Sequence, residues 1–379
     1  MILTRTDADY AANVFEDFFS SFNRIDDYMR KIKLERIDAL PFTLPGMGPE
    51  NDLFAKFDMH PNDMEFTIAK AQLNQFMSYL NIVVSAPVES SIPGKSFNLV
   101  VREKNTGLVV GMIRFGSPTI NSRPRNEWLG KPLDTMNAEV MKRFNATCIM
   151  GFNIVPVQPF GFNYLGGKLL AAICCSHMVS DILNNKYDSN ICMFETTSLY
   201  GNAKNGVSMY SGMKPILYGN GQTESNFAPL INDDNYRSLS DWFKKRNGGE
   251  PLVPSDASSR KLKTQTKMVS IIKNSLKEYD MNAYEKFCKV FLDAKGLTQQ
   301  KNSYYSCMGY DRESVKKYLN LESDTIQKAE NYDRFSLEGV TEWWRKKASK
   351  RYDNLKSDGR LRTVLETWNI NADDIDIIR

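Results

Sequence analysis

The chain has 379 residues, of which 49 are basic and 45 acidic, so its formal net charge is only +4. Bulk charge therefore makes no case for nucleic acid, and only local basic patches can do so. The six cysteines include no CxxC pair, and the only histidines are His60 and His177, which argues against a metal site. We expect reduced core cysteines in a cytoplasmic protein. The uncharged run 146–167 contains Asn153, Pro156 and Pro159, so we expect no membrane span.

The first third of the chain begins with helical periodicity. Residues 8–33 place Tyr10, Val14 and Phe18 on one helix face, which predicts an amphipathic docking helix. The segment from Ala39 to Asn51 is rich in proline and glycine and is typical of a linker. Pro61 and Asn62 then start a pattern that predicts a helix up to Leu80.

Two apolar runs follow, from Phe97 to Val101 and from Leu108 to Phe115, joined by a turn at 105–107. They predict an antiparallel hairpin. The next stretch is an irregular loop that carries four candidate nucleic-acid-binding residues, namely Arg123, Arg125, Trp128 and Lys131. Its cations suit a phosphate backbone and its tryptophan suits a base, although a solvated loop with one anchoring tryptophan has the same composition. Thr135 to Phe144 is expected to be helical.

The stretch from Cys148 to Gly219 is the centre of the chain. Its first strand, Ile149 to Val157, breaks at prolines that cannot donate to a neighbouring strand. Gly166 and Gly167 precede a helix of about five turns, and a second strand, Ile191 to Phe194, follows it. A strand, a glycine turn at a helix N-terminus and a parallel strand form a natural anion site. The alternative is a tight turn with no ligand.

The remainder is mostly helical in pattern, with a boundary near Asp233 or Asp234. Five helices are expected, at Leu239–Lys245, Gln265–Tyr279, Asn282–Ala294, Arg312–Leu319 and Leu337–Leu355. The last one carries a second candidate nucleic-acid patch, made of Arg345, Lys346 and Lys347. The adjacent Trp343 and Trp344 point to different helix faces, so one of them is expected in the core.

The element order of residues 60–220 resembles that of the N-acetyltransferase (GNAT) superfamily. In that fold the fourth strand parts from the fifth, the pantetheine arm of coenzyme A lies in the opening, and the pyrophosphate sits on a Q/R-x-x-G-x-G/A loop. Here the matching residues are Asn163 to Lys168, NYLGGK, in which Gly166 holds a pattern position and Asn163 and Lys168 depart from it. The run NGVSMYSGMKP is similar to the final elbow, Y-x-x-x-G-F, but is two residues shorter.

This resemblance implies acetyl-CoA or another acyl-CoA as cofactor, bound by backbone groups of the first strand and by the glycine turn: Ile154, Val155, Val157, Asn163, Gly166, Gly167 and Lys168. It implies Tyr210 as the acid that reprotonates the thiolate. Glu195, directly after the strand Ile191 to Phe194, and His177, on the helix before that strand, are the candidates for the base that deprotonates an amine. The simpler alternatives are a solvated strand-end carboxylate, a satisfied core histidine and a packed tyrosine.

A narrower resemblance rests on the pieces GLVVGMIRFGSP, RNEWLG, GGKLLA and EGVTEWWRKKASKRYDNLKSDGRLR. They look like the DruA family of Druantia anti-phage systems, which is scattered through phages and mobile elements. The phage protein Mom, a GNAT-like modifier of adenine in DNA, makes DNA the expected acceptor by analogy.

The expected fold is thus α/β, with a GNAT-like mixed central sheet flanked by helices and a mainly helical C-terminal domain. We expect an N-terminal helix and linker (1–55), an acyltransferase-like domain (56–232) and a helical domain with basic patches (233–379). The expected function is acyl transfer from a coenzyme A thioester to an amine, with DNA as acceptor, in the cytoplasm of the host cell. The alternative is a non-catalytic protein on the same scaffold that binds nucleic acid or a phage or host protein.

Overall fold

The computed structural model describes residues 1–38, 52–84, 94–198, 206–224, 229–257, 259–297, 301–369, 372 and 375. The chain forms two compact units. One comprises Met1–Arg36, Ser85–Ile92 and Asn226–Gln299, and the other comprises Ile37–Val84, Pro93–Ser225 and Gln300–Arg379. This division differs from the expected one, because the N-terminal helices pack with residues 226–299 and the chain after residue 300 returns to the sheet unit. The expected linker, Ala39 to Asn51, lies outside the described residues.

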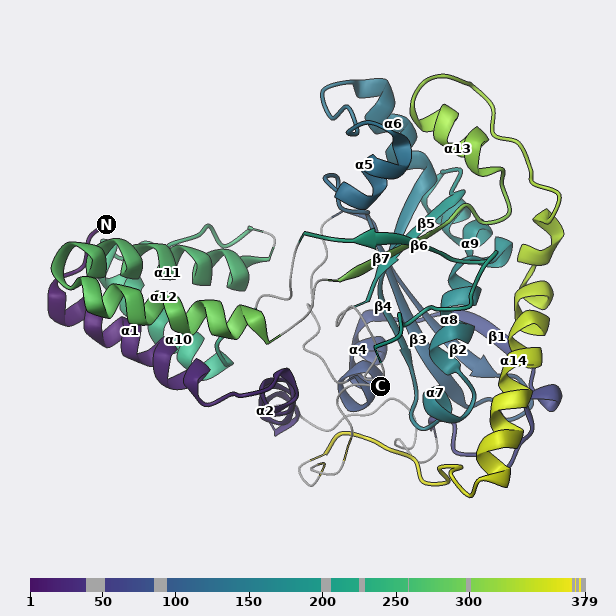
Figure 1. Ribbon diagram of the computed structural model, residues 1–379, viewed down its shortest axis with the longest axis horizontal. Helices are drawn as coiled ribbons and strands as arrows, with labels where there is room; N and C mark the ends of the chain where they lie inside the picture. Colours follow the sequence, from purple (N-terminus) through teal and green to yellow (C-terminus); the bar gives the residue numbers. More distant parts are fainter. Residues whose placement is uncertain are drawn as a thin grey trace. The chain divides into compact units, whose positions relative to one another are not determined.

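The helical unit consists of α1 (Arg5–Ser20), α2 (Ile25–Asp38), α10 (Asp233–Arg246), α11 (Arg260–Tyr279) and α12 (Met281–Gly296). Figure 1 shows α1 lying beside α11 and α12, with which it packs. Between α1 and α12 lies an aromatic cluster of Phe15, Phe19, Phe287 and Phe291. The single helix expected over residues 8–33 is divided, because α1 ends where the Ser21 hydroxyl donates to the Phe18 carbonyl at 2.6 Å.

The other unit contains a seven-stranded mixed sheet in the order β1-β2-β3-β4-β5-β7-β6 (Figure 1). Its strands are β1 (Phe66–Lys70), β2 (Ser96–Glu103), β3 (Val109–Gly116), β4 (Cys148–Pro156), β5 (Met193–Thr197), β6 (Tyr218–Gln222) and β7 (Asn302–Ser306). The expected hairpin is confirmed as β2 and β3, and the two central strands are confirmed as the parallel pair β4 and β5. The sheet confirms the mixed α/β class.

Three strands lie where the sequence pattern indicated something else. The helix expected from Pro61 to Leu80 is instead the short helix η1 (Pro61–Asp63), strand β1 and helix α4 (Leu73–Val83). Strand β6 lies in a stretch for which no strand was expected, and β7 lies in the part expected to be mostly helical. Each is held by pairing with a strand distant in sequence, and β7 also buries Tyr304 and Tyr305. Such tertiary pairing overrides a weak local pattern.

The sheet unit's remaining helices are α5 (Arg123–Leu129), α6 (Ala138–Thr147), α7 (Phe160–Asn163), α8 (Gly166–Cys174), α9 (His177–Tyr187), α13 (Arg312–Leu319), η2 (Tyr332–Phe335) and α14 (Leu337–Ser357). Helix α5 replaces the expected irregular loop. The long helix expected after Gly166 is bent by 50° into α8 and α9. The Ser176 side chain caps α9 by accepting from the Val179 amide at 3.4 Å. Among the described residues no single helix is long and apolar enough to cross a bilayer, and only this bent pair passes by length and composition.

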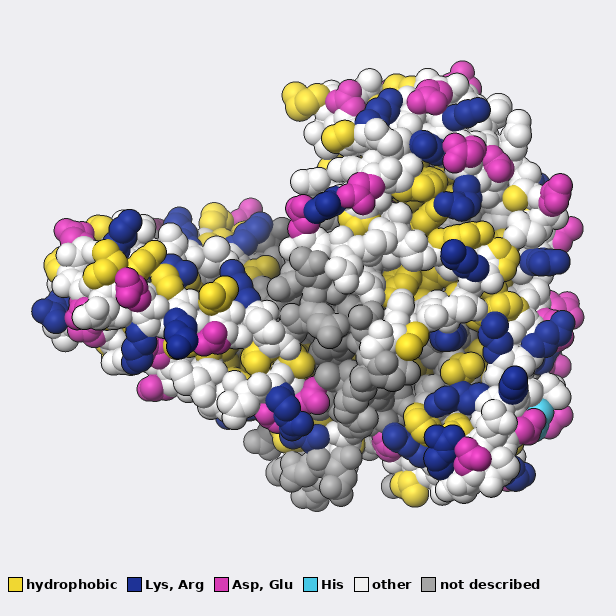
Figure 2. Space-filling view, viewed as in Figure 1, with side chains coloured by type: hydrophobic (Ala, Val, Ile, Leu, Met, Phe, Trp, Pro, Cys, Tyr) yellow, Lys and Arg dark blue, Asp and Glu magenta, His cyan; other side chains and the backbone are white. Residues whose placement is uncertain are grey.

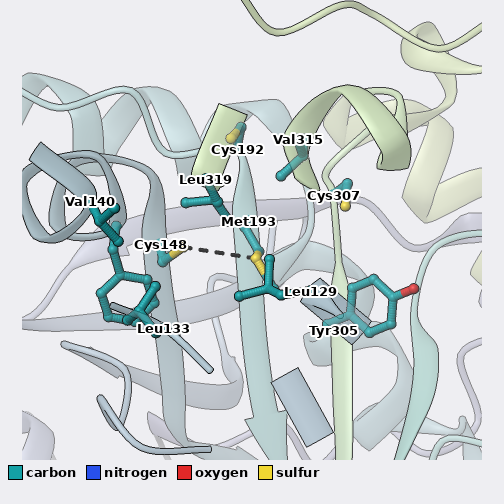
Figure 3. Close-up of a cluster of buried hydrophobic side chains, with 11 residues drawn as sticks. Leu129, Leu133, Val140, Cys148, Cys192, Met193, Tyr305, Cys307, Val315 and Leu319 are labelled. Atoms are coloured by element: carbon teal, nitrogen blue, oxygen red, sulfur yellow. Dashed lines mark hydrogen bonds between the residues drawn. The ribbon is translucent and has the colours of Figure 1, made fainter. Parts of the chain in front are cut away.

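Figure 3 shows the part of the core where α5, α6 and α13 meet the sheet. Its 11 buried residues are Leu129, Leu133, Val140, Phe144, Cys148, Cys192, Met193, Tyr305, Cys307, Val315 and Leu319. The Cys148 thiol lies 3.8 Å from the Met193 sulfur, across the parallel strand pair. All six cysteines are free thiols, and five of them are buried, as expected for core residues.

Helix α8 packs close to the sheet over Gly111. A Cβ atom on Gly111 would lie 2.4 Å from Leu170 Cδ1, so only glycine fits under this helix. The close approach places the start of α8 beside β3 and β4, with which it makes contacts.

Candidate functional site

The parallel strands β4 and β5 part within the sheet. Their pairing runs from Cys148 with Met193 to Gly151 with Thr196, whereas β4 continues to Pro156 along β3. The Thr196 hydroxyl donates to the Gly151 carbonyl at 2.9 Å at the last paired position. Beyond it, β4 has no partner on the β5 side among the described strands. Phe152, the extra residue of a bulge, is 42% exposed.

The backbone groups expected to face a cofactor lie in or next to this unpaired part of β4. Ile154 and Val155 are half-buried there. The amide of Val157 already donates to the Val110 carbonyl at 2.9 Å. Val155 lies opposite Met112 in the same ladder, two residues before Val157, so its amide faces β3 as well. Neither amide is available to a thioester, so Val155 and Val157 are removed from the candidate set and Ile154 remains.

The glycine turn starts α8. Leu165 adopts the left-handed conformation, with φ of 54°, and its carbonyl accepts from the amides of Lys168 and Leu169. The amides of Gly166 and Gly167, the first two of the helix, have no partner within it. Gly166 is packed against the Phe160 ring, whereas space around the Gly167 Cα is open. The geometry suits a small anion.

Lys168 connects this turn to the glycine-rich elbow. Its ammonium group donates to the Ser211 carbonyl at 2.7 Å, one residue after Tyr210. Burial lowers the pKa of Lys168, and the nearby charges of Lys347 and Arg351 lower it further. The residues expected to hold a pyrophosphate and the residue expected to act as acid are thus brought together by the tertiary structure.

Asn163 has a structural role in this turn. It is fully buried, its side-chain amide donates to the Arg362 carbonyl at 2.7 Å, and its oxygen accepts from the Arg362 amide at 3.1 Å. The adjacent Tyr164 carbonyl accepts from the indole of Trp344, at 2.7 Å. Because its side chain is buried and bound to the Arg362 backbone, Asn163 is not available as a ligand to pyrophosphate.

Tyr210 is half-buried behind the elbow. Its ring lies edge-on to Tyr304 with centroids 4.9 Å apart. Burial raises the pKa of Tyr210 strongly, and the neighbouring thiols and Tyr304 add to the effect. The phenol is protonated at neutral pH, as a proton donor must be, and its raised pKa makes it a weaker acid than an exposed tyrosine.

Glu195 forms a buried ion pair rather than a solvated strand end. It is 8% exposed and its Oε2 lies 2.8 Å from Nη1 of Arg125, which is fully buried. Burial raises the pKa of Glu195, and the Arg125 guanidinium opposes this rise. A carboxylate bound to arginine is a poor base, and a buried arginine cannot reach a nucleic acid. Both residues are better assigned to holding α5 on β5.

His177 is packed among aromatic rings at the start of α9. Its ring lies 4.0 Å from that of Tyr332, and Nε2 lies 3.0 Å from the Met308 carbonyl oxygen. Burial lowers the pKa of His177. This matches the simpler alternative of a satisfied core histidine. Within the described ranges, no group of three or more His, Cys, Asp or Glu side chains is arranged to hold a metal ion.

The other loop residues expected to bind nucleic acid do not form one surface. Trp128 packs against Tyr305, with ring centroids 5.0 Å apart. Arg123 is ion-paired with Glu127 at 2.8 Å and with Glu224 at 3.1 Å. Arg123 and exposed Lys131 both line a shallow surface hollow of about 430 Å³ beside α5. Of the four, Arg123 and Lys131 are exposed, Trp128 is half-buried and Arg125 is buried.

Helix α14 places its two tryptophans as expected, with Trp344 fully buried and Trp343 half-buried. Arg345 donates to the Met64 carbonyl at 2.9 Å, and both Arg345 and Lys346 pair with Glu342. Lys347 is exposed and forms no ion pair in the described structure. Figure 2 shows lysine and arginine side chains gathered over the C-terminal half of α14 and neighbouring α7.

Two further cations lie in this region, Arg351 in the basic cluster of α14 and Arg362 beyond it, and neither was among the candidate binding residues. Arg351 donates to the Phe162 carbonyl at 2.6 Å, and the Arg362 guanidinium lies 4.0 Å from the Phe162 ring centroid. The available signal was spacing, because Arg351 follows Lys347 by four residues on a predicted helix and so shares its face.

Comparison with known proteins gives one match. The family model described as Druantia protein DruA matches residues 58–204, so this part of the chain is similar to that family. The match includes β1 to β5 and the glycine turn. No curated protein and no solved structure matches the chain.

Proposed function

We propose that the sheet unit is a GNAT-like acyltransferase domain of a phage-related protein, which binds a coenzyme A thioester and transfers its acyl group to an amine, with DNA as the acceptor. The observation that carries the proposal is the parting of β4 from β5 after Gly151 and Thr196. In the acyltransferase fold that the sequence resembles, the pantetheine arm occupies this opening. The match to DruA, a family of anti-phage systems, supports the phage setting.

The start of α8 is the proposed pyrophosphate site. The amides of Gly166 and Gly167 and the positive end of the helix dipole favour an anion there. Lys168 adds a positive charge at the same turn and bonds to the Ser211 carbonyl at 2.7 Å. This bond holds the pyrophosphate site next to the elbow that carries Tyr210.

In the proposed reaction, the amine nitrogen attacks the thioester carbonyl carbon, a C–N bond forms and the C–S bond breaks. The amide of Ile154, which faces away from β3, stabilises the oxyanion. Tyr210 gives its proton to the departing thiolate, and the proton lost by the amine returns to the phenolate through water. The cycle therefore needs neither Glu195 nor His177, which are held in an ion pair and an aromatic stack.

A non-catalytic ligand-binding role is the second candidate. One observation favours it: the side chain of Asn163, at a pattern position of the resembled pyrophosphate loop, is buried and hydrogen-bonded to the Arg362 backbone. A protein that no longer binds the cofactor would not need to keep the side chain at residue 163 available for pyrophosphate.

Isothermal titration of the full chain with acetyl-CoA separates the two candidates. We expect binding to wild type and to Gly167→Ala, because a Cβ at residue 167 meets no atom within 4 Å. Gly167→Glu places a negative charge at the same open position and is expected to weaken binding at least tenfold. Absence of heat with wild type at millimolar acetyl-CoA would rule out the enzyme. Equal binding by the alanine and glutamate variants would place the ligand elsewhere.

Catalysis is tested with acetyl-CoA and an amine-bearing DNA oligonucleotide, by following release of free thiol. Tyr210→Phe is expected to lower the rate of thiol release while leaving acetyl-CoA affinity unchanged. Thiol release that requires no DNA would assign another acceptor.

A further inference from the structure

Three cations from two helices, Lys168 of α8 and Lys347 and Arg351 of α14, lie together without acidic partners. None of them forms an ion pair within the described part of the chain. By contrast, Arg345 and Lys346 on α14 pair with Glu342, and Arg360 beyond α14 pairs with Asp358 at 2.6 Å. The neighbourhood of Lys168 therefore has an excess of positive charge that the chain itself does not balance.

Arg351 is held in place by contacts with Phe162, just before the glycine turn. Arg351 donates through Nε to the Phe162 carbonyl at 2.6 Å, and its guanidinium lies 4.8 Å from the Phe162 ring centroid. This leaves its two terminal nitrogens as donors. Lys347 lies one helical turn before Arg351 on the same face of α14. Helix α14 packs on both α7 and α8.

The cations act on one another, which supports their proximity. The charges of Lys347 and Arg351 add to burial in lowering the pKa of Lys168. Burial lowers the pKa of Arg351, and Arg360 and Arg362 lower it further. Like charges held together in a folded protein are costly unless an anion binds to them.

We propose that Lys347 and Arg351 bind a phosphate monoester that is separate from the pyrophosphate at the start of α8, with Lys168 lying between the two groups. The ligand of the sheet unit is then a nucleotide that carries both groups, as coenzyme A does. This inference rests on the proposed coenzyme A site. A phosphate monoester carries a charge of about −1.5 to −2 at pH 7, which matches one lysine and one arginine, and guanidinium groups bind phosphate through paired donors.

The test compares coenzyme A with 3′-dephospho-coenzyme A, which lacks only the phosphate monoester, by titration against the full chain. We expect coenzyme A to bind about tenfold more tightly. Lys347→Gln is expected to weaken coenzyme A about tenfold and to leave dephospho-coenzyme A unchanged. Lys346→Gln is the matched control, because Lys346 is also exposed but is paired with Glu342. Arg351→Lys, which keeps the charge but not the paired donors, is expected to have an intermediate effect.

Each other outcome overturns a defined part of the proposal. Equal affinity for the two ligands would remove the monoester site and leave the coenzyme A site intact. Lack of binding by both ligands would overturn the proposed function and this inference with it. A single-stranded DNA oligonucleotide that binds in a Lys347-dependent manner, where coenzyme A does not, would assign the cluster to a nucleic-acid backbone instead.

Discussion

Nη1 of Arg125 lies 2.8 Å from Oε2 of Glu195, and the two side chains are 0% and 10% exposed. The pair joins α5 to β5 one residue before the parallel strands part, since Glu195 is in register with Met150 and the last pair is Gly151 with Thr196. Arg125 also donates through Nη2 to the Thr119 carbonyl at 2.7 Å, and its guanidinium lies 4.5 Å from the Phe144 ring centroid. This pair therefore holds α5 against β5 next to the point where β4 and β5 part.

The first prediction concerns this pair. Arg125→Leu leaves the Glu195 carboxylate buried without its partner, so we expect the free energy of unfolding to fall by about 3–5 kcal/mol. The double variant Arg125→Leu with Glu195→Leu is expected to recover most of this loss, because no buried charge remains. Urea unfolding of the full chain measures both effects.

Arg123→Leu is the matched control, because Arg123 forms its ion pairs at the exposed surface and surface pairs contribute about 0–1 kcal/mol. A double variant less stable than Arg125→Leu alone would show that the pair does more than neutralise its own charges.

The second prediction separates the two adjacent glycines of the turn. A Cβ on Gly166 would lie 2.6 Å from Cδ1 of the fully buried Phe160, which has no room to move. Gly166→Ala is therefore expected to lower the free energy of unfolding by about 1–3 kcal/mol. Gly167→Ala meets no atom and is expected to be neutral or stabilising by up to about 1 kcal/mol. Thermal unfolding of the two variants checks this, and an equal loss at both positions would contradict the close packing on Phe160.

The third prediction concerns pH and His177. Burial holds the pKa of folded His177 below the usual 6.5. The unfolded chain therefore binds the proton more tightly, so the contribution of His177 to stability is present above pH 6.5 and is lost as pH falls toward the folded pKa. We expect the stability difference between wild type and His177→Phe, which keeps an aromatic ring at this position, to shrink as pH falls below 6.5.

Urea unfolding at a series of pH values measures this difference. His60→Gln is the control, because His60 is the other of the chain's two histidines. Its Nε2 lies 3.4 Å from Oδ1 of Asp353, and its side chain is 30% exposed. If the pH dependence of stability changed in His60→Gln but not in His177→Phe, the prediction for His177 would be wrong.

The elements predicted from sequence are those with strong local patterns. The β2 and β3 hairpin has two apolar runs around an Asn-Thr-Gly turn, and α11 to α14 have clear helical periodicity. Strand β4 is apolar and ends at Pro156, which cannot continue a central ladder. Strands β1, β6 and β7 were not predicted, because each is short and is stabilised by a neighbour far away in the chain.

For the candidate site, local patterns predict the glycine turn before α8 and the parallel strand on each side, and helical spacing puts Lys347 and Arg351 on one face. The contacts made by the charged side chains depend on the tertiary structure. It pairs Arg125 with Glu195, 70 residues apart, and places Lys168 against Ser211, 43 residues away. It also brings α14 onto α8. Local periodicity sets which face of an element is apolar, but contacts between distant segments depend on how the whole sheet and its helices pack. Because of this packing, Glu195 and Arg125 form a buried ion pair instead of contributing to catalysis or nucleic-acid binding, and Arg351 lies beside the glycine turn.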